Sequence, residues 1–148
     1  MTEYISISVI IITRNRANWL EEALRSLTCQ TRQPDEVVVV DNDSHDSTRE
    51  VTHKYRDMLN IKYVFELTKG VPYARNAGIA NAGGDIIAFM DDDCDADREW
   101  LKNIERPFIK DPAIGVVGGE LSYLKVNEGN MIEEFYIKNM IARKRNKT

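Results

Sequence analysis

The stretch DIIAFMDDDCDAD, residues 85–97, joins an apolar run directly to five aspartates within seven positions. The run at residues 86–90 is continuous, which is typical of a strand buried on both faces of a parallel sheet. The crowded aspartates repel one another, so folding disfavours them unless a cation lies among the carboxylates. The stretch therefore predicts a buried strand that ends in a cation-binding turn.

Apolar runs and helical patterns alternate along the rest of the chain. Further strands are expected at residues 5–12, 36–40, 61–67 and 114–124, and helices near 17–29, 51–59, 72–82 and 97–110. Met131, Ile132, Phe135 and Met140 indicate a last amphipathic helix. This alternation favours an α/β fold, with a mostly parallel sheet flanked by helices. No repeat or linker interrupts it, so residues 1–148 are expected to form a single domain.

The composition suits a compact soluble protein, with 43% apolar and 30% charged residues. The net charge is −4, and the tail at residues 142–148 carries four basic residues, which leaves −8 for the rest. An acidic body argues against nucleic acid as a partner. The tail is expected to be a solvated helix end, with contact to an anionic membrane surface as the alternative. Cys29 and Cys94 are too few for a disulfide framework, and no secretion signal is seen, so a cytosolic protein is expected.

Three of the expected strands end in polar turns, which are TRNR (13–16), DNDSHDS (41–47) and DDDCDAD (91–97). The carboxyl ends of parallel strands lie at one edge of a sheet, where ligands bind, so we expect the three turns to converge. Carboxylate oxygens in such a turn suit Mg²⁺ or Mn²⁺.

Simpler explanations account for part of these turns. Asp46 or Ser47 is expected to cap a helix, and so is Asp97, whereas one cap cannot use three consecutive aspartates. A calcium-binding EF-hand loop is excluded, because Ala96 and Lys102 stand where that loop needs glycine and glutamate. His45 and His53 lack metal-ligand spacing.

A fourth feature is the stretch GVPYARNAGIANAGGD, residues 70–85. Its glycines, Gly70 among them, permit positive φ or a close approach of the backbone. Arg75 follows an expected helix start that Pro72 marks, where a guanidinium and backbone N–H groups can face an anion. Pairing of Arg75 with the acidic turns is the alternative, and both can hold.

Taken together, these segments resemble the family 2 glycosyltransferases, which have a GT-A fold. The resemblance lies in SVIIITRNRANWLEEALRSLTCQ, PDEVVVVDNDSHDST, GVPYARNAGIANAGGDIIAFMDDD and the WL pair at residues 100–101, and it covers roughly residues 6–121. It implies an enzyme that transfers a sugar from a nucleotide-diphosphate donor to an acceptor hydroxyl, with Mn²⁺ or Mg²⁺ as cofactor and inversion at the anomeric carbon. A UDP-sugar is the first expectation, with GDP- and dTDP-sugars as alternatives.

The resemblance also implies roles for individual residues. The donor-binding set is Thr13, Arg14, Asn15, Asp41, Asn42, Gly70, Arg75, Asp91 and Asp92, and the metal ligands are Asp93 and Asp91. Asn42 stands where the family often has an aspartate that contacts the base, so base preference is expected to depend on it. A glycan or a lipid-linked molecule is the expected acceptor, and polysaccharide assembly the expected setting.

The catalytic base is the missing part of this assignment. In the family it usually lies in a later acidic motif, and here Glu120 is only a weak candidate by position. We therefore expect a donor-binding portion of a longer enzyme, with a homodimer through the last helix as one way to cover its apolar surface. A noncatalytic nucleotide-sugar or metal-binding module is the alternative function. A sugar-nucleotide pyrophosphorylase is disfavoured because TRNRAN contains no glycine.

Overall fold

The computed structural model describes residues 4–119, 121–123, 135–137 and 142–144. The helices are α1 (Ala17–Thr28), α2 (Thr48–Lys54), α3 (Val71–Asn81) and α4 (Trp100–Lys110). The longer strands are β1 (Ile7–Thr13), β2 (Glu36–Asp41), β3 (Ile61–Phe65) and β4 (Ile86–Asp91). The short strands are β5 (Cys94–Ala96), β6 (Val116–Val117), β7 (Leu121–Tyr123), β8 (Phe135–Ile137) and β9 (Ala142–Lys144).

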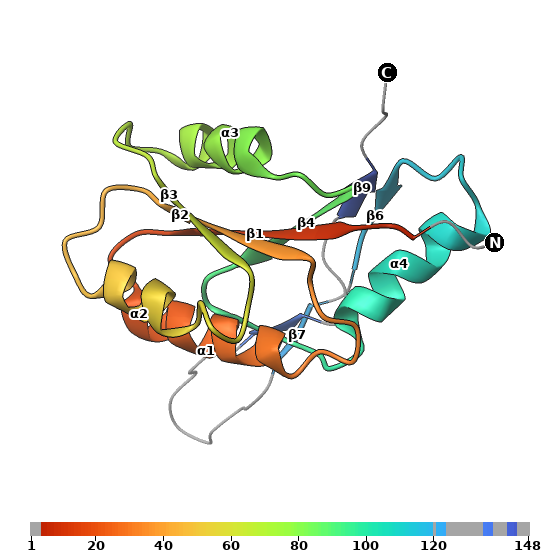
Figure 1. Ribbon diagram of the computed structural model, residues 1–148, viewed down its shortest axis with the longest axis horizontal. Coiled ribbons are helices and arrows are strands. Elements are labelled where there is room, and N and C mark those ends of the chain that lie inside the picture. Colours follow the sequence, from red (N-terminus) through yellow and green to blue (C-terminus); the bar gives the residue numbers. More distant parts are fainter. Residues whose placement is uncertain (1–3, 120, 124–134, 138–141, 145–148) are drawn as a thin grey trace.

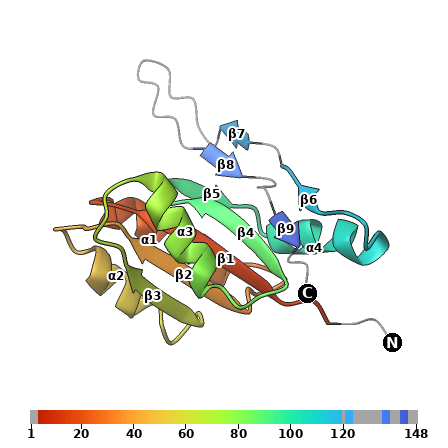
Figure 2. The ribbon, with the colours of Figure 1, turned by 90° about the horizontal axis from the view of Figure 1, so that it is seen from above.

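The main sheet has the strand order β3-β2-β1-β4-β9-β6. Its first four strands are parallel, and β9 lies antiparallel between β4 and β6. Helix α3 covers one face of the sheet, while α1, α2 and α4 lie on the other (Figure 1). A second, small sheet of order β5-β8-β7 lies beside this layer arrangement (Figure 2). The predicted α/β fold with a mostly parallel, helix-flanked sheet is confirmed.

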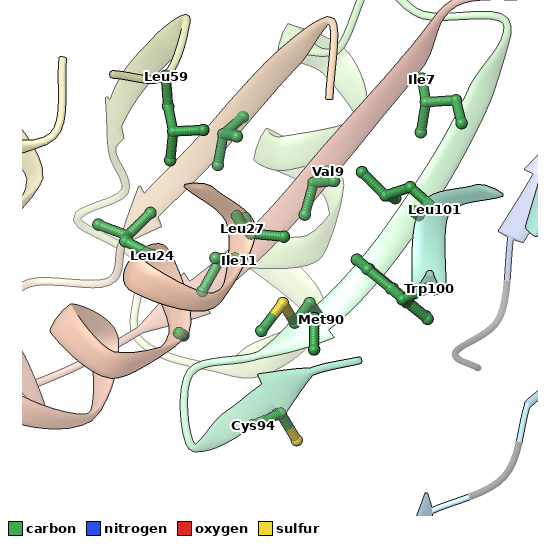
Figure 3. Packing of buried hydrophobic residues seen from close by; sticks show 14 of the residues in the cluster. Ile7, Val9, Ile11, Leu24, Leu27, Leu59, Met90, Cys94, Trp100 and Leu101 are labelled. Carbon is green, nitrogen blue, oxygen red and sulfur yellow. The ribbon is translucent and has the colours of Figure 1, made fainter. Parts of the chain in front are cut away.

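The side chains of β1 alternate between two hydrophobic cores, one on each face of the sheet. Ile7, Val9 and Ile11 belong to the larger core and are completely buried, together with residues of α1 and α4 (Figure 3). Ile10 points to the other face, where it packs in a smaller core beneath α3. Burying each such side chain contributes roughly 1.5–3 kcal/mol. The two cores thus fix the ends of the parallel strands relative to one another.

Trp100 anchors the start of α4 against the same large core. It is 0% exposed, as is Leu101 beside it, and both belong to the same core as Met90 at the end of β4 (Figure 3). The acidic residues 91–97 are therefore held between two buried anchors, Met90 before them and Trp100 after them. The predicted helix at 97–110 begins three residues later, and the Asp97 carboxyl accepts the Glu99 N–H just ahead of it.

The carboxyl-terminal part of the chain departs from the sequence-based expectation. Phe135 lies in strand β8 and not in a helix, while Met131, Ile132 and Met140 lie outside the described residues. Apolar spacing in a short segment does not separate a helix from a strand, and here pairing with β5 and β7 selects the strand. The predicted homodimer required a last helix that includes Phe135, and Phe135 lies in a strand.

Two further expectations for this region were wrong. The single strand predicted at 114–124 is broken into β6 and β7, which belong to different sheets. The basic tail is not a helix end where it is described, because Arg143 and Lys144 lie in β9 and pair antiparallel with β4. Within the residues that can be described, no helix is both long enough and apolar enough to span a bilayer.

Candidate functional site

The polar turns after β1, β2 and β4 meet at one edge of the main sheet. In the strand pairing, Thr13 at the end of β1 lies opposite Asp41 of β2, and Ile12 lies opposite Asp91 of β4. An open cavity of about 420 Å³ lies at this edge. It is lined by Ile12, Thr13, Arg14, Arg16, Asn42, Gly70, Val71, Arg75, Asp91, Asp92 and Asp93. The predicted convergence of the three turns is confirmed.

Most of the residues predicted from the sequence line this cavity. Asn15 and Asp41 do not, and Glu120 lies outside the described residues. Ile12, Val71 and Arg16 line it without having been predicted. Arg16 was detectable in principle, because it follows the same strand end as Arg14 and directly precedes a helix.

The acidic turn places two carboxylates where one ion can meet both. Ligand atoms of Asp91, Asp93 and Cys94 all lie within 4.8 Å of one another. Burial, together with the negative charges of Asp91 and Asp93, raises the pKa of the Cys94 thiol to about 12, so the thiol stays protonated and is a poor ligand. The remaining donors are carboxylate oxygens beside an open cavity. Such a set fits Mg²⁺ or Mn²⁺, which bind one or two carboxylates and complete their shell with water or phosphate oxygens.

The surroundings of this turn disfavour the ionised form of two of its carboxyl groups. Burial and the charge of Asp93 raise the pKa of Asp91, while the positive charges of Arg75 and Arg16 act in the opposite direction. Burial also raises the pKa of Asp92, although the Thr13 hydroxyl and the positive charge of Arg16 act to lower it. The Thr13 hydroxyl is buried and acts on the Asp92 carboxyl, although within the described residues it makes no hydrogen bond of regular geometry.

Arg16 bridges two of the three aspartates. Its Nη1 donates to Asp92 Oδ1 at 2.8 Å and to Asp93 Oδ2 at 3.2 Å. The Asp92 carboxylate is only 6% exposed, whereas Asp93 is 32% and Arg16 48% exposed. The guanidinium thus provides part of the positive charge that the sequence of the turn requires.

The second turn uses its polar side chains to hold the backbone. The buried Asp41 accepts hydrogen bonds from the Tyr63 hydroxyl at 2.6 Å and from the Ser44 N–H at 2.9 Å. Burial and Asp41 raise the pKa of Tyr63, so the phenol keeps the proton that it donates. In this arrangement Asp41 shapes the wall behind the cavity.

Asn42 binds the loop between β3 and α3 with its whole amide group. Its Nδ2 donates to the carbonyls of Glu66 at 2.9 Å and Thr68 at 2.8 Å, and its Oδ1 accepts the Gly70 N–H at 2.9 Å. Both amide hydrogens are therefore in use, although the side chain reaches the cavity wall. A contact of Asn42 with a base stays a prediction, and its carbonyl lone pair is the group left for it.

Asn15 ties the first turn to the second. It has a positive φ of 53°, its N–H donates to Ser44 Oγ at 2.9 Å, and its side-chain oxygen accepts the His45 N–H at 2.7 Å. These bonds lie outside the cavity lining. Asn15 is thus placed to set the shape of the turn that carries Arg14 and Arg16.

The Asp46 carboxylate bonds the first N–H groups of two helices, although the residue at the N-cap position of α2 is Ser47 and that of α1 is Arg16. One carboxylate oxygen accepts the Thr48 N–H at 3.1 Å at the start of α2, and the other accepts the Ala17 N–H at 2.9 Å at the start of α1. Burial acts to raise the pKa of Asp46, but the hydrogen bonds from Thr48 and Ala17 outweigh it and leave the pKa lowered. Asp46 therefore fixes the helix that directly follows Arg16.

The start of α3 forms the remaining wall. Gly70 adopts a φ of 135°, which side-chain-bearing residues rarely adopt, and precedes the helix whose first turn contains Pro72. The Arg75 guanidinium lies 5.5 Å from the centre of the Phe89 ring and also lines the cavity. The positive end of the α3 helix dipole and the Arg75 guanidinium give this wall an anion-binding character.

Comparison with known proteins finds glycosyltransferases, both by family model and by sequence identity. The family model described as Glycosyl transferase family 2 matches residues 8–147. The chain is 33% identical over 133 residues to the glycosyltransferase AglE of Haloferax volcanii, an alignment that covers 87% of this chain and 43% of AglE.

Two solved structures are similar in fold. The crystal structure of Staphylococcus aureus TarS (residues 1–349) superposes with a TM-score of 0.74 and 31% identity over 86% of this chain and 39% of the other. The mannosyltransferase PcManGT of Pyrobaculum calidifontis, solved with GDP-Man and Mn²⁺, gives a TM-score of 0.75 and 26% identity over 97% of this chain and 46% of the other. The chain thus spans less than half the length of each of these proteins.

Proposed function

This chain belongs to glycosyl transferase family 2, and we propose that it holds the donor site of an enzyme that transfers a sugar from a nucleotide diphosphate to an acceptor hydroxyl. The observation that carries the proposal is the cavity at the strand ends, which combines the Asp91 and Asp93 carboxylates with the cations Arg14, Arg16 and Arg75. A nucleotide diphosphate and a divalent ion together match this mixture of charges.

Asp91 and Asp93 would hold the divalent ion, either Mn²⁺ or Mg²⁺. When bound, the ion supplies Lewis-acid stabilisation of the charge that grows on the leaving diphosphate. The choice of these two residues is supported by the closeness of their oxygens, and the choice of a divalent ion by PcManGT, which was solved with Mn²⁺. Asp92 is buried and paired with Arg16, which suits a residue that positions the turn.

The cationic wall would bind the diphosphate itself. Arg75 lies at the start of α3, where the helix N-terminus adds its positive potential to the guanidinium. Across the cavity, Thr13 and the exposed Arg14 line the wall that would contact the nucleoside. TarS was solved with UDP-GlcNAc and PcManGT with GDP-Man, so we propose UDP first and GDP second for this chain.

The transfer would proceed with inversion. The acceptor hydroxyl attacks the anomeric carbon from the face opposite the diphosphate, and a carboxylate base takes the hydroxyl proton. The cavity described here accounts for donor binding and for stabilisation of the leaving group. We propose that the base and the acceptor contacts, for a glycan or a lipid-linked acceptor, come from outside the cavity lining.

The proposal is tested by Asp93→Asn with Asp95→Asn as the matched control. Both changes remove one negative charge from the same acidic stretch, but only Asp93 lines the cavity. We expect Asp93→Asn to lose the Mn²⁺-dependent part of UDP or GDP binding in calorimetry, and Asp95→Asn to keep it. Equal behaviour of the two folded variants would contradict the placement of the ion.

A further inference from the structure

Arg16 forms an ion pair with Asp93, whose carboxylate is also a proposed ligand of the metal ion. Its Nη1 lies 3.2 Å from Asp93 Oδ2, and the same nitrogen is held 2.8 Å from Asp92 Oδ1. Asp93 is a proposed ligand of the ion and is partly exposed, whereas Asp92 is buried. One cationic side chain therefore joins the buried carboxylate to the proposed metal ligand.

The two ends of Arg16 differ in how firmly they are held. Its backbone lies directly before α1, its carbonyl accepts the Leu20 N–H at 3.0 Å, and the next residue is bonded to Asp46. Its side chain is 48% exposed at the open cavity. The backbone is thus fixed, while the guanidinium can change partners without any movement of the fold.

Charge determines what happens when an ion arrives. A guanidinium and a divalent ion on the same carboxylate repel each other, because together they carry three positive charges and Asp93 supplies only one negative charge. A diphosphate changes this balance because it offers the guanidinium a new partner with matching geometry. The ion and the nucleotide would then each favour the binding of the other.

We propose that Arg16 is the counter-cation of Asp93 in the ligand-free protein, where it competes with the divalent ion, and that a nucleotide diphosphate relieves this competition. The inference rests on the proposed function. It makes Arg16 a positioning residue that couples metal binding to nucleotide binding. Because such coupling is reciprocal, the nucleotide must strengthen metal binding by the same factor by which the metal strengthens nucleotide binding.

The test is a set of Mn²⁺ titrations followed by the electron paramagnetic resonance of free Mn²⁺, without nucleotide and with saturating UDP or GDP. Arg16→Gln is expected to bind Mn²⁺ alone roughly tenfold more tightly than the wild type, the effect of removing one positive charge beside a doubly charged ion. The factor by which nucleotide strengthens Mn²⁺ binding should fall correspondingly. Arg16→Lys, which keeps the charge, should stay close to the wild type without nucleotide.

Arg14→Gln is the matched control. Arg14 lines the same cavity, and within the described part of the chain it has no carboxylate within ion-pair distance, so the change removes an equal charge without freeing Asp93. It should alter Mn²⁺ binding in the absence of nucleotide less than Arg16→Gln does. Circular dichroism would be used to check that each variant is folded.

The outcomes separate this inference from the proposed function. If the wild type shows metal–nucleotide coupling and Arg16→Gln leaves both Mn²⁺ affinity and coupling unchanged, the inference is wrong and the proposed function stands. Weaker Mn²⁺ binding by Arg16→Gln would also overturn it, since Arg16 would then assemble the ion site. If the wild type binds nucleotide with no dependence on Mn²⁺, the proposed function fails, and the inference fails with it.

Discussion

Asn42→Asp is the substitution that distinguishes most clearly between holding the site together and contacting a ligand. The amide of Asn42 makes three hydrogen bonds to the loop between β3 and α3, two of them as the donor. A carboxylate in its place would face the carbonyl oxygens of Glu66 and Thr68 at 2.9 and 2.8 Å with no hydrogen to offer. The variant is isosteric, so the loss is one of hydrogen bonding and charge.

The expected cost follows from these contacts. The carboxylate loses the two hydrogen bonds that the amide donates, and each is worth about 1 kcal/mol. Burying a negative charge against two carbonyl oxygens adds a further cost. We expect the free energy of unfolding to fall by about 2–4 kcal/mol at pH 8. The pKa of the introduced carboxyl is expected to be raised in the folded state, so the folded state binds its proton more tightly than the unfolded chain does. The penalty therefore grows as the pH rises above about 4 and shrinks toward acid pH, where a protonated carboxyl can donate one bond.

Urea denaturation at pH 5 and pH 8, followed by tryptophan fluorescence, measures both quantities. Asn42→Ala serves as the control, because it removes all three bonds without adding a titratable group and should show a loss that does not depend on pH in this way. A stability for Asn42→Asp within about 0.5 kcal/mol of wild type at pH 8 would refute the reasoning. So would a loss of the same size at both pH values.

Three further changes test other parts of the structure. Gly78→Ala is expected to cost about 1–2 kcal/mol in urea denaturation, because the new Cβ would lie 2.6 Å from a methyl carbon of β1, whereas Gly83→Ala, whose Cβ meets only a side-chain oxygen at 3.5 Å, should be nearly neutral. In the folded protein Cys29 should react with a thiol reagent at pH 8 and Cys94 should not, because Cys29 is exposed, and the pKa of the buried Cys94 is about 12; equal rates would contradict its burial. Asp46→Ala should cost about 1–2 kcal/mol at pH 7. Since the pKa of Asp46 is lowered by folding, the part of its contribution that depends on the charge is present above about pH 4 and decreases as the pH falls further, so a difference from wild type that does not shrink on acidification would contradict this account of Asp46.

The convergence of the turns could be predicted because it follows from strand direction alone. Strands that are buried on both faces appear as continuous apolar runs, as in residues 86–90, and the carboxyl ends of parallel strands must share an edge. The position of Asp93 in the cavity followed from this reasoning. The hydrogen bond of Asp46 at the start of α2 was predictable too, since an aspartate ahead of a helix often accepts a backbone N–H there.

The parts that could not be predicted depend on contacts between distant segments. Asn42 bonds backbone carbonyls of a loop 24 and 26 residues later, and nothing in the residue types of that loop announces such a partner. Arg16 meets Asp92 across 76 residues of sequence. Strand β8 forms by pairing with β5 and β7, which outweighs a local spacing that resembles a helix.

The most direct test of the central claim is calorimetric titration of the chain with UDP, GDP and dTDP, each with Mn²⁺ and again with EDTA. The account predicts that at least one nucleotide binds with Mn²⁺ and that EDTA abolishes or strongly weakens the binding, because Asp91 and Asp93 hold the ion that neutralises the diphosphate. If a demonstrably folded sample binds none of the three with Mn²⁺, or binds equally well in EDTA, the cavity at the strand ends is not a metal-dependent donor site.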